Sequence, residues 1–152
     1  MNKQDQYAAI EKDFLKIVAE NPPWEAALVS LIALLKEGLS YVTWVGVYRL
    51  VEETLWIGPY QGKVACAQIP AGRGVCGTAV VRKKPIVVRN VEDFPGHIAC
   101  DPKSQSELVI PVEYKKKILG VLDLDSHDLA AFDQVDVDQL TEFLGQLENL
   151  RL

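Results

Sequence analysis

The sequence predicts an α+β fold, in which a largely antiparallel sheet has helices on one face and long loops on the other. Two observations support this class. Apolar residues recur at helical spacing at both ends of the chain, and pairs of strand-like segments separated by short turns lie between them. The 152 residues, with no internal repeat or linker, fit a single domain spanning residues 1–152.

Helices are expected at both ends of the chain. Helical spacing of apolar residues runs over residues 3–19, and Asn21-Pro22-Pro23 ends that segment. A second helix is expected over 24–37, with proline at its start. Its apolar residues spread over more than one face, which predicts that it is largely buried. Helical spacing returns near Phe132 and continues to the end of the chain.

The strands are expected as two hairpins and one short segment. Residues 41–51 are rich in β-branched and aromatic residues, and residues 55–60 read as their hairpin partner. Residues 85–88 form a brief strand, and residues 107–112 and 118–125 form the second hairpin. Hairpins imply antiparallel pairing, which is why the sheet is expected to be largely antiparallel.

Two loops connect these elements. Residues 61–74 are loop-like, residues 75–82 favour one short helix, and residues 89–104 contain two prolines, a glycine and little periodicity. Loops of this length are often functional. All three cysteines of the chain lie in or beside these loops, so this face of the sheet is the candidate functional face.

Composition and charge exclude several classes of function. The net charge of −5 and the shortness of the two basic runs argue against a nucleic-acid partner. The longest apolar stretch, Ala26 to Leu35, is too short to cross a membrane. The polar N-terminus is not followed by the apolar core of a signal peptide, so we expect a cytoplasmic protein. Disulfides in that compartment are usually catalytic or redox-sensing.

The three cysteines are Cys66, Cys76 and Cys100. Cys76 follows a glycine-rich turn at the start of the short helix, where the partial positive charge of the helix favours a thiolate. Cys100 lies in a loop bounded by Gly96 and Pro102, which favours a reactive thiol over a small buried apolar side chain. The cluster therefore suggests thiol chemistry.

Two other interpretations of these motifs are weaker. The three cysteines with His97 could supply a zinc site, but their spacing lacks the close pairs typical of structural zinc, so we expect no metal. We expect His97 and His127 at the surface. The G-x-G-x-x-G pattern at residues 72–77 lacks the long helix of a dinucleotide site, and here it indicates a sharp turn.

Acidic residues form a second candidate cluster. Alternation along a strand places Asp123 and Asp125 on the same side, and Glu107 begins the neighbouring strand. Convergence of these carboxylates would favour a bound cation or a carboxyl group that keeps its proton. A polar strand end without function explains the pattern equally well.

Aromatic residues mark the first strand. Trp44 and Tyr48 share parity, as do Val42 and Gly46, so these side chains could face one pocket. Plain packing in the core is the commoner outcome for a single tryptophan.

Taken together, these motifs resemble the free methionine-(R)-sulfoxide reductases, a family of stand-alone GAF-domain enzymes. The resemblance covers nearly the whole chain, and the cysteine trio is its specific part. The segments that carry it are residues 41–48, Gly72-Arg73-Gly74-Val75-Cys76-Gly77, His97-Ile98-Ala99-Cys100-Asp101, residues 104–109 and Gly120-Val121-Leu122-Asp123-Leu124-Asp125-Ser126.

The resemblance implies a redox cycle on cysteine. Cys100 attacks the sulfoxide sulfur and is left as a sulfenic acid, and Cys66 or Cys76 condenses with it to a disulfide that thioredoxin reduces. Cys66 is the preferred resolving thiol, with Cys76 auxiliary or alternative. Glu107 would protonate the sulfoxide oxygen, because that oxygen is a poor leaving group until it is protonated.

The resemblance also implies how the substrate is held. Asp123 and Asp125 would bind the ammonium group of the free amino acid or help to polarise the oxygen. Trp44 would pack against the substrate's methyl group, with Tyr48 near by. No cofactor is needed. Independently of the resemblance, the apolar faces of the terminal helices suggest a homodimer. The rival interpretations are a GAF sensor that binds a small ligand and a thiol redox switch, both without turnover.

Overall fold

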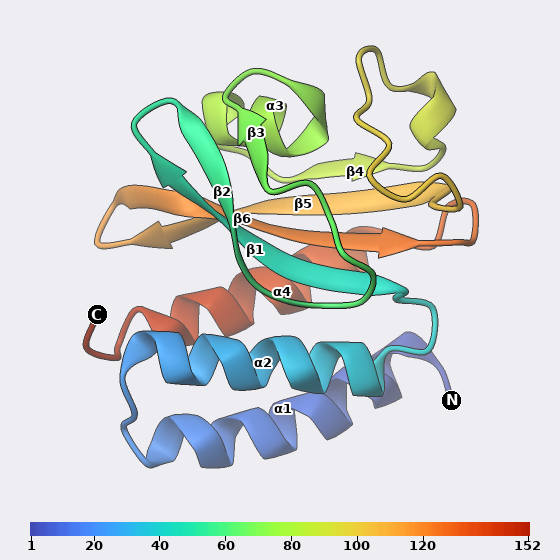
Figure 1. The fold of residues 1–152 in the computed structure, drawn as a ribbon. Coiled ribbons are helices and arrows are strands. Elements are labelled where there is room, and N and C mark those ends of the chain that lie inside the picture. The colour runs from blue at the N-terminus through green and yellow to red at the C-terminus, as the bar shows by residue number, and fades with distance from the viewer.

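A computed structural model describes residues 1–152 and contains four helices, one short 3-10 turn and six strands. Figure 1 shows their arrangement. The elements, in chain order, are α1 (Lys3–Ala19), α2 (Trp24–Gly38), β1 (Trp44–Val51), β2 (Thr54–Gln61), β3 (Gln68–Pro70), α3 (Gly74–Arg82), β4 (Ile86–Val88), η1 (Val91–Asp93), β5 (Ser106–Tyr114), β6 (Lys117–Ser126) and α4 (Gln134–Leu147).

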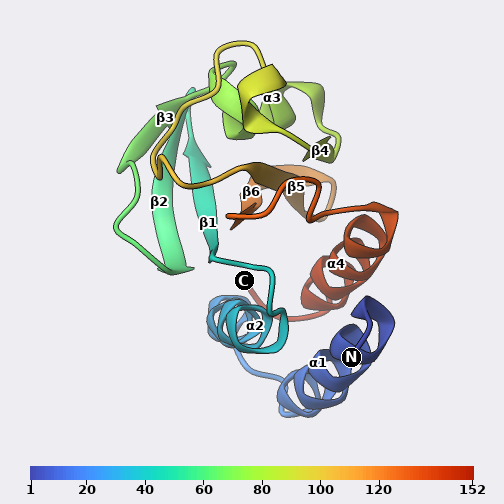
Figure 2. The same ribbon diagram turned by 90° about the vertical axis from the view of Figure 1, so that its right-hand side faces the viewer.

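The strands form one six-stranded sheet in the order β3-β2-β1-β6-β5-β4, and every neighbouring pair is antiparallel. Helices α1, α2 and α4 lie on one side of this sheet, while α3 and the loops around it lie on the other (Figure 2). The predicted class and the division between helices and loops are therefore confirmed.

The helix side holds the larger apolar core. Phe14 of α1 and Phe143 of α4 meet edge to face with ring centroids 5.5 Å apart, and Leu28 of α2 is fully buried between the helices and the sheet. The apolar faces of the terminal helices thus pack on one another and on β1, β5 and β6. These faces had suggested a homodimer, and the structure uses them inside the chain.

One buried carboxylate ties this layer together. Asp136, in the first turn of α4, accepts hydrogen bonds from the hydroxyl groups of Tyr7 and Tyr41, and its Oδ2 forms an ion pair with Lys3 Nζ. It also accepts a hydrogen bond from the backbone N–H of Asp133 at 2.8 Å and so completes a capping box. The carboxylate is fully buried and fully partnered.

Several predicted boundaries differ from the observed ones. The first strand begins at Trp44, not at residue 41, because the chain turns before it and sends Val42 into the helix-side core. The predicted loop at 61–74 contains the edge strand β3, whose three residues are too few to show a period. The last helix ends at Leu147.

No helix of this structure is both long enough and apolar enough to cross a membrane.

Candidate active site

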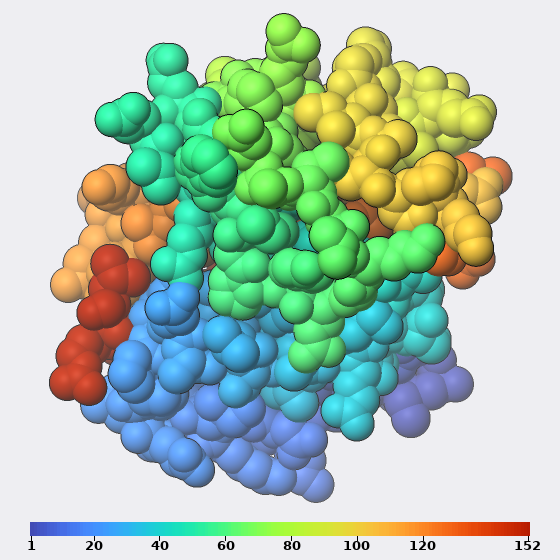
Figure 3. Space-filling view, in the orientation of Figure 1, coloured from blue at the N-terminus to red at the C-terminus, as the bar shows by residue number.

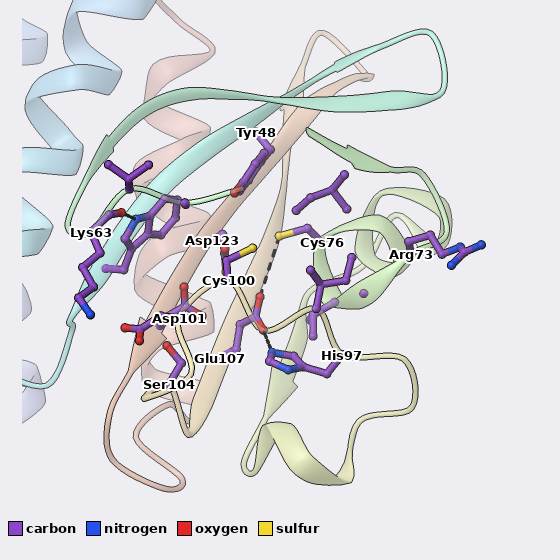
Figure 4. A pocket seen from close by; sticks show the side chains of 18 residues that line it. Tyr48, Lys63, Arg73, Cys76, His97, Cys100, Asp101, Ser104, Glu107 and Asp123 are labelled. Atoms are coloured by element: carbon purple, nitrogen blue, oxygen red, sulfur yellow. Dashed lines mark hydrogen bonds and ion pairs between the residues drawn. The ribbon is translucent and has the colours of Figure 1, made fainter. Parts of the chain in front are cut away.

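A pocket lies on the loop side of the sheet, between α3 and the segments that contain Cys66 and Cys100 (Figure 4). Its walls come from β1, β5, β6, α3 and the loop before β5. In the space-filling view the green segment after β2 meets the yellow segment before β5 across this face (Figure 3). The predicted site residues that line the pocket are Trp44, Tyr48, Cys76, Cys100, Glu107, Asp123 and Asp125.

Cys66 and Cys100 form a disulfide, with their Cα atoms 5.7 Å apart. The bond joins the loop between β2 and β3 to the loop before β5, across 34 residues of sequence. Cys100 lines the pocket, whereas Cys66 is not among the lining residues, and both residues are partly exposed. Cys76 is a free, buried thiol. The structure therefore pairs the two cysteines of the long loops.

The register of β5 against β6 brings the acidic residues to one face of the sheet. Glu107 of β5 is paired with Asp125 of β6, and Asp123 lies two residues further along β6 on the same face. On the other side of β6, Trp44 of β1 is paired with Asp125. Glu107 and Asp123 are both buried, and Asp125 is partly buried. The predicted convergence of carboxylates on one face is thus present in the structure.

Burial changes the protonation of these acids. Burial, and secondly the nearby Asp125, raise the pKa of Glu107 to about 8. Burial raises the pKa of Asp123, reinforced by Glu107, and burial raises that of Asp125, reinforced by Asp123. Glu107 therefore carries a proton at neutral pH and can act as an acid toward a bound ligand.

The expectation that Cys76 is a thiolate was wrong. Cys76 is the third residue of α3, but it is buried, and burial raises its pKa well above the usual value. The neighbouring Asp123 and Glu107 raise it further, and Cys76 Sγ lies 4.0 Å from Glu107 Oε1. Loss of hydration and two nearby acids outweigh the weak field of one helix end.

Cys76, Glu107 and Asp123 bring one donor atom each within 4.8 Å of one another. This set differs from the zinc set considered from the sequence, because it contains neither Cys66 nor Cys100. Asp123 Oδ1 is buried without a hydrogen-bond partner. A buried acceptor without a donor is costly, so the pocket offers it to a ligand that carries donors.

His97 belongs to the site, although we had expected it at the surface. Its Nε2 lies 3.2 Å from Glu107 Oε2, and only 14% of its side chain is exposed. Burial lowers the pKa of His97. The sequence signal for this residue was its position three residues before Cys100 in the same loop. His127 is half exposed, and its Nε2 lies 3.0 Å from Asp101 Oδ2, next to Cys100.

The aromatic residues also position the loop that carries Cys66. Trp44 Nε1 donates a hydrogen bond to the carbonyl of Lys63 at 2.9 Å, and the Tyr48 hydroxyl donates one to the carbonyl of Cys66 at 2.9 Å. Gly62, at φ +133°, passes so close to the indole that a Cβ there would lie 2.5 Å from Trp44 Cδ1. Trp44 and Tyr48 thus line the pocket and also fix the position of the loop that carries Cys66.

Sequence and structure comparisons agree on the family. Residues 22–150 match the GAF domain family. The free methionine-R-sulfoxide reductase of Escherichia coli is 45% identical over 150 residues, which cover 99% of this chain and 91% of that protein. This chain belongs to the free methionine-R-sulfoxide reductase family of GAF domains.

Solved structures of this family have the same fold. The free methionine-R-sulfoxide reductase of Neisseria meningitidis, in complex with its substrate, is 38% identical with a TM-score of 0.91, over 98% of this chain and 90% of that one. The reduced form of the Staphylococcus aureus enzyme is 40% identical with a TM-score of 0.88, over 94% of this chain and 93% of that one.

Proposed function

We propose that this chain reduces free methionine-(R)-sulfoxide to methionine, with Cys100 as nucleophile, Cys66 as resolving thiol and thioredoxin as reductant. The observation that carries the proposal is a single pocket lined both by Cys100, already joined to Cys66, and by Glu107, a carboxyl group that holds its proton. Membership of the reductase family supports the reaction class.

The first step needs a protein thiolate and a protein acid that both reach the bound sulfoxide group. The Cys100 thiolate attacks the sulfoxide sulfur while Glu107 donates its proton to the oxygen, which would otherwise leave poorly. The oxygen, with that proton, then passes from the substrate sulfur to the Cys100 sulfur while the bond between the two sulfurs breaks, which releases methionine and leaves Cys100 as a sulfenic acid. The proton lost by the Cys100 thiol restores Glu107, so the step consumes no net proton.

The second step converts the sulfenic acid into the disulfide. The Cys66 thiol condenses with the sulfenic acid, an S–S bond forms, and water leaves. The Cα separation of 5.7 Å places the two cysteines within the usual range for such a bond. Thioredoxin then supplies two electrons and is itself oxidised to a disulfide. Cys76 is buried and stays outside this cycle or acts as an auxiliary thiol.

The pocket also suits a free amino acid. Its buried acids, Asp123 above all with its unpartnered Oδ1, offer acceptors to an ammonium group. Trp44 supplies an apolar surface for the methyl group, and Tyr48 stacks beside it with ring centroids 6.2 Å apart. A methionine within a peptide lacks the ammonium group, so these acids would favour the free form.

Turnover in a coupled assay tests the proposal. The protein, thioredoxin and its regenerating system are incubated with free methionine-(R)-sulfoxide, and consumption of reductant is followed. We expect turnover with this isomer and none with the (S) isomer or with an N-acetylated, amidated methionine sulfoxide. If the fully reduced protein binds the sulfoxide but releases no methionine, it is a ligand-binding GAF module and not a reductase.

A further inference from the structure

Cys76, Glu107 and Asp123 form a cluster of donor atoms, called here the thiol–acid cluster. The three residues come from α3, β5 and β6, and one donor atom of each lies within 4.8 Å of the other two. Cys76 Sγ lies 4.0 Å from Glu107 Oε1, and Asp123 lines the same pocket (Figure 4). Cys76 is the free thiol of the chain, so the proposed redox cycle leaves its sulfur without a task.

The thiol–acid cluster has no lysine or arginine among its partners. Asp123 is 6% exposed and forms no ion pair, and its Oδ1 is buried without a hydrogen-bond partner. Glu107 is equally buried, and its contact with a basic side chain is to His97. A buried acceptor without a donor costs free energy, and a bound cation removes that cost. The unpartnered oxygen of Asp123 therefore points to a positively charged ligand.

The spacing of these donors suits a tetrahedral zinc ion. Zn–S bonds are about 2.3 Å long and Zn–O bonds about 2.0–2.2 Å, so a sulfur and an oxygen on one zinc ion lie about 3.5 Å apart. The distance of 4.0 Å between Cys76 Sγ and Glu107 Oε1 has to shrink by about 0.5 Å to reach that value. Three protein donors leave the fourth position of the ion to water or another small ligand.

The kind of donors selects zinc among the common metal ions. A thiolate favours zinc over magnesium and calcium, which take oxygen ligands, and two carboxylate oxygens favour zinc over the softer copper(I). His97 supports the same arrangement from outside the donor set. Its Nε2 lies 3.2 Å from Glu107 Oε2, the oxygen that does not face Cys76. Such a histidine fixes the orientation of a carboxylate ligand.

The pocket gives an ion a route to the thiol–acid cluster. Its lining includes Lys63, Val64 and Arg73, whose side chains are exposed, so the pocket opens to the surface. The three donor residues are buried, so they lie at its inner end. An ion that enters by this route reaches the same carboxyl groups that the proposed reaction uses.

We propose that the thiol–acid cluster is a binding site for Zn²⁺, and that zinc bound there excludes free methionine sulfoxide from the pocket. The metal takes the place of the protons on the Cys76 thiol and on the two carboxyl groups, these protons pass to solvent, and no electron is transferred. Zinc then occupies Asp123, which the ammonium group needs, and leaves Glu107 without a proton to donate. The exclusion of the sulfoxide rests on the proposed function, whereas the metal site does not.

Cobalt(II) tests the metal site in the oxidised protein. With the Cys66–Cys100 disulfide intact, Cys76 is the single thiol that a metal can bind. A thiolate bound to cobalt gives a charge-transfer band in the near ultraviolet, and we expect this band in the unaltered protein. Added Zn²⁺ should displace the cobalt and abolish the band. Absence of the band from the unaltered protein would overturn the inference, whatever the variants show.

Variants of the oxidised protein identify the donors. Cys76→Ser should lose the cobalt band, and Asp123→Asn should weaken zinc binding, measured by calorimetry, by about a hundredfold or more, against about tenfold for His97→Gln. The matched control is His127→Gln, because His127 and Asp101 form a second histidine–carboxylate pair. It should bind zinc as the unaltered protein does. Lost binding in His127→Gln, or full affinity in Asp123→Asn, would place the metal elsewhere and refute the assignment.

Competition with the sulfoxide is measured in a chain that cannot turn over. Cys66→Ser/Cys100→Ser retains Cys76 alone, and the Kd for free methionine-(R)-sulfoxide is determined with and without Zn²⁺. We expect the apparent Kd to rise in proportion to the zinc concentration, and the further change Cys76→Ser to remove that rise. A Kd that does not depend on zinc would refute the exclusion. Normal zinc binding in a chain that binds no sulfoxide would instead count against the proposed function.

Discussion

Two buried aspartates on opposite sides of the sheet show how differently this fold treats the same side chain. Asp136, under the helices, meets Lys3, two tyrosine hydroxyls and a backbone N–H. Asp123, under the loops, has an oxygen with no partner and lies beside another buried acid, Glu107.

The difference in hydrogen-bond partners distinguishes an aspartate that stabilises the fold from one that can bind a ligand. A fully partnered buried carboxylate holds elements together and has nothing left to offer a ligand. A buried carboxyl group with an unpartnered oxygen costs stability in the empty protein, and that cost falls when a cationic ligand binds. The helix side is therefore the support, and the loop side is where the proposed reaction takes place.

Loss of Cys66 should produce the largest effect on turnover. Cys66→Ser removes the resolving thiol but leaves the pocket intact, so the variant should release one methionine per chain and then recycle poorly. A single-turnover measurement beside the coupled assay separates the two rates. Cys76→Ser is the matched control and should retain cycling. Unchanged cycling in Cys66→Ser would make Cys76 the resolving thiol.

Removal of the acid should slow the chemical step without weakening the fold. Glu107→Gln cannot protonate the sulfoxide oxygen, and we expect methionine release in a single turnover to slow by about 10²–10⁴-fold. Thermal unfolding should show equal or higher stability, because a buried acid has been removed. A near-normal rate would show that another group, with Asp125 the first candidate, donates the proton.

The two aspartates themselves give a direct test of the comparison. Asp136→Asn leaves Lys3 and the tyrosines with a poorer partner, and we expect a loss of about 3–5 kcal/mol in the free energy of unfolding. Asp123→Asn should leave stability unchanged or raise it, while weakening the binding of free methionine sulfoxide. Denaturant unfolding of both variants measures the first quantity. Similar losses in both would contradict the division between the two sides.

The pH dependence of stability tests the protonation of Glu107. Glu107 binds its proton up to a pKa of about 8 in the folded chain, whereas its usual pKa is 4.5. Between these values the folded state holds a proton that the unfolded state has lost, so this group's contribution to stability falls as pH rises, by up to about 1.4 kcal/mol per pH unit.

Denaturant unfolding from pH 5 to pH 8 measures this slope, and Glu107→Gln is the control. The slope should be shallower in the variant by the contribution of one group. Equal slopes in both proteins would mean that Glu107 is ionised in the folded state, and it would then not be the proton donor.

The sequence predicted the elements with strong periods and missed those without one. Helical and alternating patterns located α1, α2, β2 and the β5–β6 hairpin to within a few residues. Strand β3 has only three residues and no period, so its place at the sheet edge depends on pairing with β2.

Most of the predicted site residues line one pocket, but the sequence did not predict the electrostatics of that pocket. Alternation on β6 brought Asp123 and Asp125 to one face, as expected. The ionisation of Cys76 was predicted wrongly, because the depth of burial beneath α3 cannot be seen in a linear motif. His97 was missed for a related reason, since its contact with Glu107 depends on the path of an aperiodic loop.

The most direct test of this account is a single equivalent of substrate. Fully reduced protein is mixed with one equivalent of free methionine-(R)-sulfoxide in the absence of reductant, and methionine and disulfides are determined by mass spectrometry. The account predicts one methionine per chain, a Cys66–Cys100 bond and a free Cys76 thiol, and no methionine from Cys100→Ser. Methionine release that survives in Cys100→Ser, or no release from the unaltered protein, would contradict it.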